Sequence, residues 1–126
     1  MSMRSPLGRV RGLGSARDGV GHWWAERMTA LALIPLVLWF VTSVVMITGA
    51  DYETVRAWIA SPVVAGLLVL LVVMAFTHAA LGLQTIVEDY VHHEGAKLAV
   101  LLAIKAFALL LGLTGVLAVL TILFGG

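Results

Sequence analysis

The sequence predicts an all-α membrane protein with three transmembrane helices. Of its 126 residues, 61% are hydrophobic and 12% are charged, whereas a soluble domain is usually about 45 to 50% apolar and about a quarter charged. The few charges gather between long apolar runs, which is the pattern of spanning helices joined by short loops. Three runs are long enough to cross the hydrocarbon core of a bilayer, which requires about 20 residues of helix.

The three helices are expected at about Met28–Thr48, from Pro62 through Val87, and at about Leu98–Phe124. Pro35 lies inside the first run and is expected to kink that helix, because proline removes a backbone hydrogen bond and clashes with the preceding turn. Pro62 suits the first turn of the second helix. The predicted organisation is therefore an N-terminal arm at residues 1–27, followed by a three-helix anchor domain at residues 28–126.

The orientation in the membrane is predicted from the basic residues near the helix ends, because Lys and Arg are enriched in cytoplasmic loops. Five arginines precede the first helix and Lys97 lies between the second and third, whereas only Arg56 lies between the first and second. We therefore expect a cytoplasmic N-terminus and a C-terminus outside. The five arginines are Arg4, Arg9, Arg11, Arg17 and Arg27.

The arm "MSMRSPLGRVRGLGSAR" also allows a mitochondrial presequence, since it is rich in arginine and has no acidic residue before Asp18. Gly8, Gly12 and Gly14 argue against this, because such presequences act as amphipathic helices and each glycine costs about 1 kcal/mol within a helix. A retained arm on the cytoplasmic face of a bacterial inner membrane is expected, and the mitochondrial inner membrane is the alternative.

Composition excludes several kinds of chemistry. The chain has no cysteine, so it can form no disulfide and offers neither a thiolate nucleophile nor thiolate ligands for an iron–sulfur cluster. A formal net charge of +1 does not favour nucleic acid as a partner. Any metal must be held by histidine or carboxylate.

His78 stands in the middle of the second apolar run, where a polar side chain is expected to face a partner or a cofactor. Ala75 and Gly82, one turn to either side of it, leave room for a flat group such as a porphyrin coordinated through a histidine nitrogen. The alternative is that His78 hydrogen-bonds a neighbouring helix and that the small residues serve close packing. At about 100° per residue, one face of the helix carries Leu71, Ala75, His78, Gly82, Thr85 and Asp89.

A six-coordinate haem would need a second axial ligand from a partner. His22 is expected before the first helix, and His92 and His93 lie about 20 Å along the helix from His78 at about 1.5 Å per residue. This chain would then contribute half of the haem site.

Asp89 and Tyr90 are expected at the cytoplasmic end of the second helix, at the depth of a quinone headgroup. There the tyrosine hydroxyl can donate a hydrogen bond to a ligand carbonyl, and the adjacent carboxylate can pass protons or pair with an arginine. The alternative is an interfacial tyrosine anchor beside a solvated acid.

Two motifs add to these observations. "HAALGLQTIVEDYV", with His78, Asp89 and Tyr90, resembles the second helix of the hydrophobic membrane anchor subunits of succinate dehydrogenase, respiratory complex II. "HWWAERMTALAL" is similar to that family's first-helix segment, in which an arginine is followed shortly by Thr-Ala.

The resemblance implies that His78 is an axial ligand of a b-type haem shared with the cytochrome b subunit. It also implies that Tyr90 bonds the carbonyl of ubiquinone, that Asp89 supports this site, and that Arg27 lies near a haem propionate. For Arg27, the alternative is a topology signal only.

The resemblance implies an anchor subunit that does not itself react with succinate. The chain would anchor the flavoprotein and iron–sulfur subunits to the membrane and help to form the site where their electrons reduce quinone, in the respiratory chain and the tricarboxylic acid cycle. One alternative is a scaffold or assembly protein in which His78 only packs. Another is a small transporter subunit in which His78 and Gln84 line a polar path.

Overall fold

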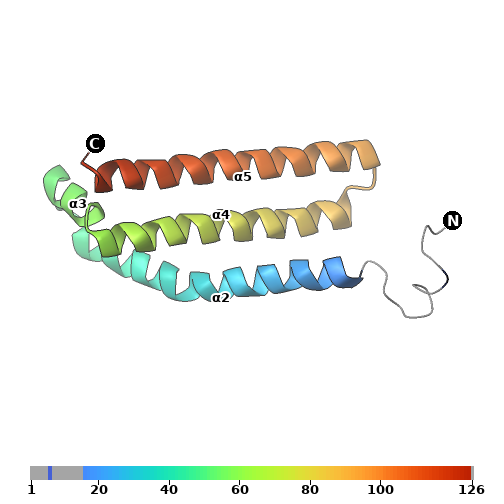
Figure 1. The fold of residues 1–126 in the computed structure, drawn as a ribbon, viewed down its shortest axis with the longest axis horizontal. Helices are drawn as coiled ribbons and strands as arrows, with labels where there is room; N and C mark the ends of the chain where they lie inside the picture. The colour runs from blue at the N-terminus through green and yellow to red at the C-terminus, as the bar shows by residue number, and fades with distance from the viewer. Residues whose placement is uncertain (1–5, 7–15, 126) are drawn as a thin grey trace.

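In the computed structural model, which describes Pro6 and residues 16–125, three long helices and one short helix follow one another along the chain (Figure 1). The long helices are α2 (Ala16–Ile47), α4 (Pro62–Tyr90) and α5 (Glu94–Leu123), and the short helix is α3 (Tyr52–Ile59). Each long helix is long and apolar enough to cross a membrane. The predicted all-α fold with three spans is therefore confirmed.

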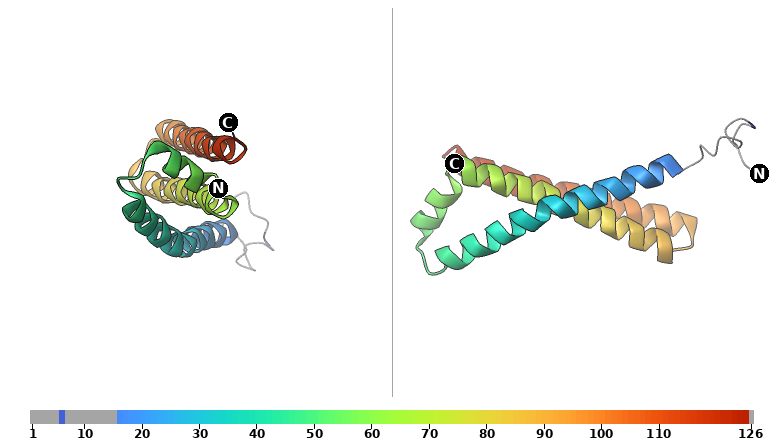
Figure 2. Two further views of the ribbon diagram at one scale, coloured as in Figure 1. Left: turned by 90° about the vertical axis from the view of Figure 1, so that its left-hand side faces the viewer. Right: turned by 90° about the horizontal axis from the view of Figure 1, so that it is seen from below.

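The three long helices form a row with α4 in the middle, between α2 and α5 (Figures 1 and 2). α4 and α5 run side by side in opposite directions, whereas α2 crosses α4 obliquely (Figure 2). α3 lies at the end of the row where α2 leads into α4. Because α4 is the only long helix with a neighbour on two sides in this row, its two faces have different partners.

α2 begins well before the apolar run that predicted it. It starts at Ala16 rather than near Met28, so residues 16–27 are helical and His22 lies within the helix, not ahead of it. Hydrophobicity marks only the part of a helix that lies in lipid, whereas backbone hydrogen bonding continues beyond it. The span Gly19–Ile47 has 29 residues, or about 43 Å at 1.5 Å per residue, which exceeds a hydrocarbon core of about 30 Å.

Pro35 lies inside α2 and does not end it. The helix continues to Ile47 and changes direction along its course (Figure 1). A missing amide hydrogen and a ring that crowds the preceding turn are the ordinary causes of such a bend.

The connection between the first two spans is predicted to be a short loop, but it contains the helix α3. Asp51 caps this helix, since its Oδ1 accepts a hydrogen bond from the backbone N–H of Thr54 at 2.9 Å, and the hydrogen bonds of Thr54 lower the pKa of the Asp51 carboxyl. Trp58 stacks on Trp39 of α2, with ring centroids 6.0 Å apart. An acidic N-cap followed by Glu53 in the first turn was the available signal for this helix.

Few side chains are buried within the chain itself. Among the described residues, the buried ones are Leu36, Ala65, Leu68, Val87 and Thr29, and α5 has none. Spanning helices gain little from burying apolar surface against each other, because lipid is as apolar as their side chains. Most of the apolar surface is therefore left to face lipid or other subunits.

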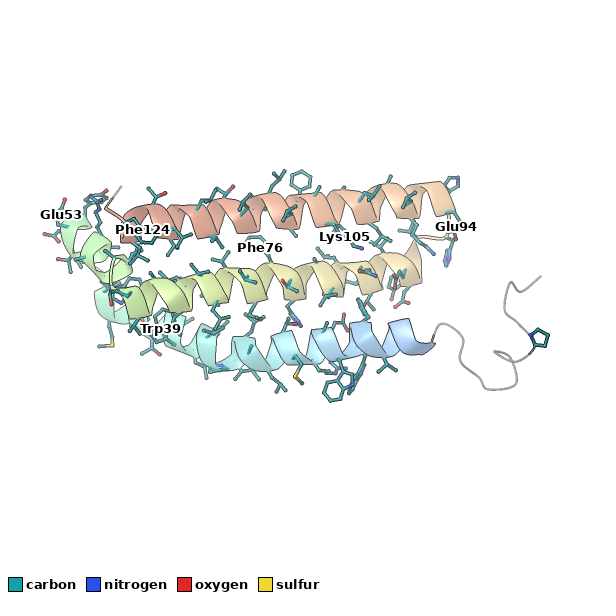
Figure 3. The ribbon with its side chains drawn as sticks, viewed as in Figure 1. Trp39, Glu53, Phe76, Glu94, Lys105 and Phe124 are labelled. Atoms are coloured by element: carbon teal, nitrogen blue, oxygen red, sulfur yellow. The ribbon has the colours of Figure 1, made fainter. Side chains whose placement is uncertain are left out.

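α4 and α5 pack closely where α5 carries glycine. A β-carbon at position 115 would lie 3.2 Å from Cγ1 of Val72, and one at position 112 would lie 3.7 Å from the Phe76 side chain. Phe76 lies between the two helices (Figure 3). Small residues at a helix contact allow the backbones to approach, which is the usual basis of packing between spanning helices.

We expect Gly115→Leu to destabilise the helical domain by about 1 to 3 kcal/mol, the usual cost of overpacking, because Val72 is β-branched and cannot readily turn aside. Gly66→Leu is the matched control, since a β-carbon there would have nothing within 4 Å. The measurement is unfolding of the purified chain in mixed micelles on addition of denaturing detergent. Equal stability of the two leucine variants would contradict the assigned packing.

Candidate functional site

His78 makes a hydrogen bond to α2 at the place where α2 crosses α4. Its Nδ1 lies 3.0 Å from Oγ1 of Thr29, a side chain that is only 7% exposed. The predicted polar face of α4 therefore points towards α2 of the same chain. One ring nitrogen of His78 therefore has a hydrogen-bond partner within the chain, as the packing alternative predicted. The other ring nitrogen is Nε2.

The direction of this hydrogen bond follows from the other contacts of Thr29. Its hydroxyl has one hydrogen, and the backbone oxygen of Ala25 lies 2.7 Å away, with that of Glu26 at 3.1 Å. A hydroxyl that donates to its own helix accepts from His78, and the shorter contact to Ala25 therefore favours the tautomer with the ring hydrogen on Nδ1. The threonines that bond solely to their own helix show the same donor distance of 2.7 Å: Thr48 to Val44, Thr114 to Leu110 and Thr121 to Leu117.

A neutral histidine with its hydrogen on Nδ1 has a lone pair on Nε2. Within residues 16–125 no hydrogen bond reaches this Nε2 atom, and the ring is half-buried. Metal-binding histidines usually have this arrangement, in which one nitrogen donates to a protein oxygen and the other is the ligand. A histidine in this arrangement has one nitrogen available to bind a metal ion.

The surroundings of His78 fit a planar group that needs one ligand from this chain. A β-carbon at Gly82, one turn from His78, would have nothing within 4 Å, so the helix surface is open there. No group of three or more His, Asp or Glu side chains that could hold a free metal ion occurs in the described part of the chain. A haem iron receives four nitrogens from its own ring, so one histidine from this chain suffices.

A second hydrogen bond joins the same two helices near the Thr29–His78 pair. Oγ1 of Thr85 donates to Oε1 of Glu26 at 3.0 Å, while the carbonyl of Leu81 in its own helix is farther away, at 3.2 Å. The two pairs follow the order expected for antiparallel helices, because Glu26 precedes Thr29 along α2 whereas Thr85 follows His78 along α4. Sequence reasoning placed Thr85 on the correct face but did not identify Glu26 as its partner.

Arg27 does not join His78 in this chain. Its guanidinium carbon lies 5.5 Å from the ring centre of Trp23, and the side chain is exposed. Two residues correspond to about 200° around a helix, so Arg27 points away from the face on which Thr29 meets α4. His22, in the same helical segment, has a buried Nε2 with no hydrogen-bond partner among the described residues.

Asp89 and Tyr90 form the last turn of α4, and both are exposed, Tyr90 by 77%. They lie about 16 Å or more along the helix from His78 at 1.5 Å per residue, so the structure places two separate candidate sites on one helix.

The two histidines that follow α4, His92 and His93, differ from each other. His92 is exposed, whereas Nδ1 of His93 caps α5 by accepting from the N–H of Ala96 at 3.0 Å.

The opposite side of α4 carries an apolar groove of about 460 Å³ shared with α5. Gln84 and Lys105 are among its lining residues, and Lys105 projects towards α4 (Figure 3). Gln84 donates to Oε1 of Glu88 at 2.9 Å. Since His78 points to α2 and Gln84 to this groove, the two side chains do not line one polar path as the transporter alternative required.

Comparison with known proteins supports the resemblance seen in the two motifs. The chain matches the family described as succinate dehydrogenase/fumarate reductase transmembrane subunit over residues 1–114. It is 27% identical over 107 residues to the succinate dehydrogenase hydrophobic membrane anchor subunit of Rickettsia bellii, covering 85% of this chain and 86% of that protein.

Two further relatives have similar names. The hydrophobic membrane anchor subunit of succinate dehydrogenase from Paracoccus denitrificans is 29% identical over 100 residues, covering 79% of this chain and 78% of the relative. The succinate dehydrogenase membrane anchor subunit of Reclinomonas americana is 26% identical over 96 residues, covering 74% and 80%.

Proposed function

Because the chain belongs to the family of succinate dehydrogenase/fumarate reductase transmembrane subunits, we propose that it is the membrane anchor of a succinate:quinone oxidoreductase that also helps to bind a b-type haem and quinone. In this role it holds the flavoprotein and iron–sulfur subunits at the membrane together with the cytochrome b subunit. Succinate is oxidised on the other chains and does not touch this one.

The haem part of the proposal rests on one observation, the commitment of His78 Nδ1 to Thr29. It leaves Nε2 with a lone pair and no partner within the described chain, beside the open helix surface at Gly82. The haem, when bound, supplies a one-electron redox centre. His78 would be the ligand that this chain supplies, and the cytochrome b subunit would supply the second one.

Arg27 is proposed to pair with a haem propionate. Its guanidinium is exposed on a side of α2 that is free of α4, so it faces the region where a partner subunit would pack. A guanidinium forms strong, charge-assisted hydrogen bonds with carboxylates. The Trp23 ring beneath it holds the group in place through a cation–π contact.

The quinone part rests on Asp89 and Tyr90, which end α4 side by side and exposed. Reduction of ubiquinone to the quinol takes up two electrons and two protons. The Tyr90 hydroxyl donates a hydrogen bond to one quinone carbonyl, and this bond strengthens as negative charge builds on that oxygen. The Asp89 carboxylate, at the same depth, relays protons from the aqueous side.

The proposed location is a bacterial cytoplasmic membrane, with the N-terminus and the α4–α5 loop in the cytoplasm. The first part of α2, which contains Arg17 and Arg27, and the start of α5, which contains Lys97, lie at the same end of the row (Figure 1). Arg4, Arg9 and Arg11 of the predicted arm lie outside the described residues. This orientation puts Asp89 and Tyr90 on the same side as the subunits that supply electrons.

The orientation predicts that a reporter active only outside the cytoplasm works when fused after Gly126. The physical reason is the excess of basic residues at the opposite ends of the spans. The same reporter placed in the α4–α5 loop, after His92, is the control and should be inactive. Activity only at the loop position would reverse the assigned orientation.

Replacing His78 with Ala should alter the optical spectrum or the potential of the b-type haem in the assembled complex, because the imidazole that this chain would supply to the iron is removed. His92→Ala is the control, since that side chain is exposed in the loop. Reduced-minus-oxidised spectra and potentiometry provide the measurement. An unchanged haem in the His78 variant would remove this residue from the site and favour the scaffold alternative, in which His78 only packs.

Replacing Tyr90 with Phe removes the hydroxyl and keeps the ring, so the complex should assemble. Loss of a hydrogen bond to a developing charge costs about 1.5 to 3 kcal/mol, which corresponds to roughly tenfold to hundredfold slower quinone reduction. Electron transfer from succinate to a soluble dye that bypasses quinone should remain near the parent rate. Equal quinone-reductase rates in complexes with matched haem and flavin contents would reduce Tyr90 to an interfacial anchor.

A further inference from the structure

We propose that Thr29 is the positioning residue of the haem ligand, and that its hydroxyl oxygen, by accepting the Nδ1 hydrogen of His78, sets the orientation of the imidazole and the potential of the haem. The inference rests on the proposed function, since it requires that His78 binds the haem through Nε2. It assigns to α2 a part in the redox chemistry that is distinct from membrane anchoring.

The hydroxyl of Thr29 is itself fixed before it meets His78. It is buried, and its hydrogen is directed to the Ala25 carbonyl at 2.7 Å. A lone pair of the oxygen is therefore left to point across the helix crossing at Nδ1, 3.0 Å away. Because neither the hydroxyl nor the helix behind it is free to turn, the acceptor selects one tautomer and one ring orientation for His78.

The neutral character of the acceptor determines how far it tunes the ligand. A carboxylate in this position would draw the Nδ1 hydrogen strongly and increase electron donation from the ring to iron. A hydroxyl oxygen attracts the Nδ1 hydrogen more weakly than a carboxylate does. It therefore orients the ring while the imidazole stays neutral. Removing it leaves an N–H without a partner in a water-poor site, which costs free energy and weakens the ring as a donor to the ferric ion.

Thr85 provides an internal comparison. It is also a threonine, it also bonds across the same pair of helices, and its partner Glu26 lies one turn from Thr29. It has no hydrogen bond with His78 among the described residues. Thr29→Val and Thr85→Val therefore each remove one hydroxyl and one interhelical bond at constant shape, but only the first removes the acceptor of the His78 hydrogen.

The experiment measures the midpoint potential and the electron paramagnetic resonance spectrum of the haem in the fully assembled complex. We expect Thr29→Val to raise the potential, because the ferric state loses more ligand donation than the ferrous state. If the affinity of the imidazole for the ferric ion falls tenfold more than its affinity for the ferrous ion, the midpoint potential rises by about 59 mV for this one-electron couple. Thr29→Ser keeps the oxygen and should retain the parent potential.

The control variants separate positioning from packing. Thr85→Val should leave the potential and the spectrum at parent values, and Thr29→Ala, which cannot overfill the crossing, should reproduce the shift of Thr29→Val if that variant assembles poorly. Equal shifts in the Thr29 and Thr85 variants would assign the effect to the helix crossing and overturn the inference.

Failure of the inference is distinguishable from failure of the proposed function. If neither Thr29→Val nor Thr29→Ala changes the haem while His78→Ala does, then His78 is a ligand that Thr29 does not position. If the parent complex contains no b-type haem, or if His78→Ala leaves it unchanged, then haem binding by this chain is itself wrong and the role of Thr29 falls with it.

Discussion

The lack of water in the bilayer core is the constraint on which the rest of this structure depends. Every backbone N–H and C=O in a span must be bonded within the protein, so α2, α4 and α5 are helices throughout. Polar side chains in the spans meet the same requirement, and they can meet it in two ways. They either bond to their own helix, or they bond to a neighbouring one.

The threonines show both solutions, and the difference identifies the site. Thr114 and Thr121 on α5 donate to the carbonyl four residues earlier, and within the described residues they have no hydrogen bond to another helix. Thr29 does the same and in addition accepts from His78, whereas Thr85 turns its hydrogen towards Glu26. Hydrogen bonds between spanning helices contribute only about 0.6 to 2 kcal/mol each, so their main consequence here is to fix the positions of two helices and one imidazole.

The two faces of α4 have separate tasks as a result. One face carries His78, which meets Thr29 of α2 and lies one turn from the open helix surface at Gly82. The other face packs against the glycines of α5 and forms the apolar groove. The candidate haem ligand lies within the span, while Asp89 and Tyr90 lie at its end. The two proposed sites therefore lie at different depths of the same helix.

The exposed surfaces of α2 agree with a chain that is completed by partners. Trp23 of α2 contacts both Trp24 and Arg27, and all three side chains are exposed. Only a few residues are buried within the described chain. A bundle with so small an interior core is expected for an anchor whose remaining apolar surface is covered by lipid and by other membrane subunits.

The sequence by itself determined the three spans, the face of α4 that carries His78, and the Asp89–Tyr90 pair at its end, because each depends only on local hydropathy and on the 100° helical period. The helical start at Ala16 and the short helix α3 were not predicted, since helices extend past the apolar segments that mark them. Only the tertiary structure decided that His78 meets Thr29 and that Glu26 meets Thr85. These pairs are separated by 49 and 59 residues, and their meeting depends on the angle and register at which α2 crosses α4, which no local pattern encodes.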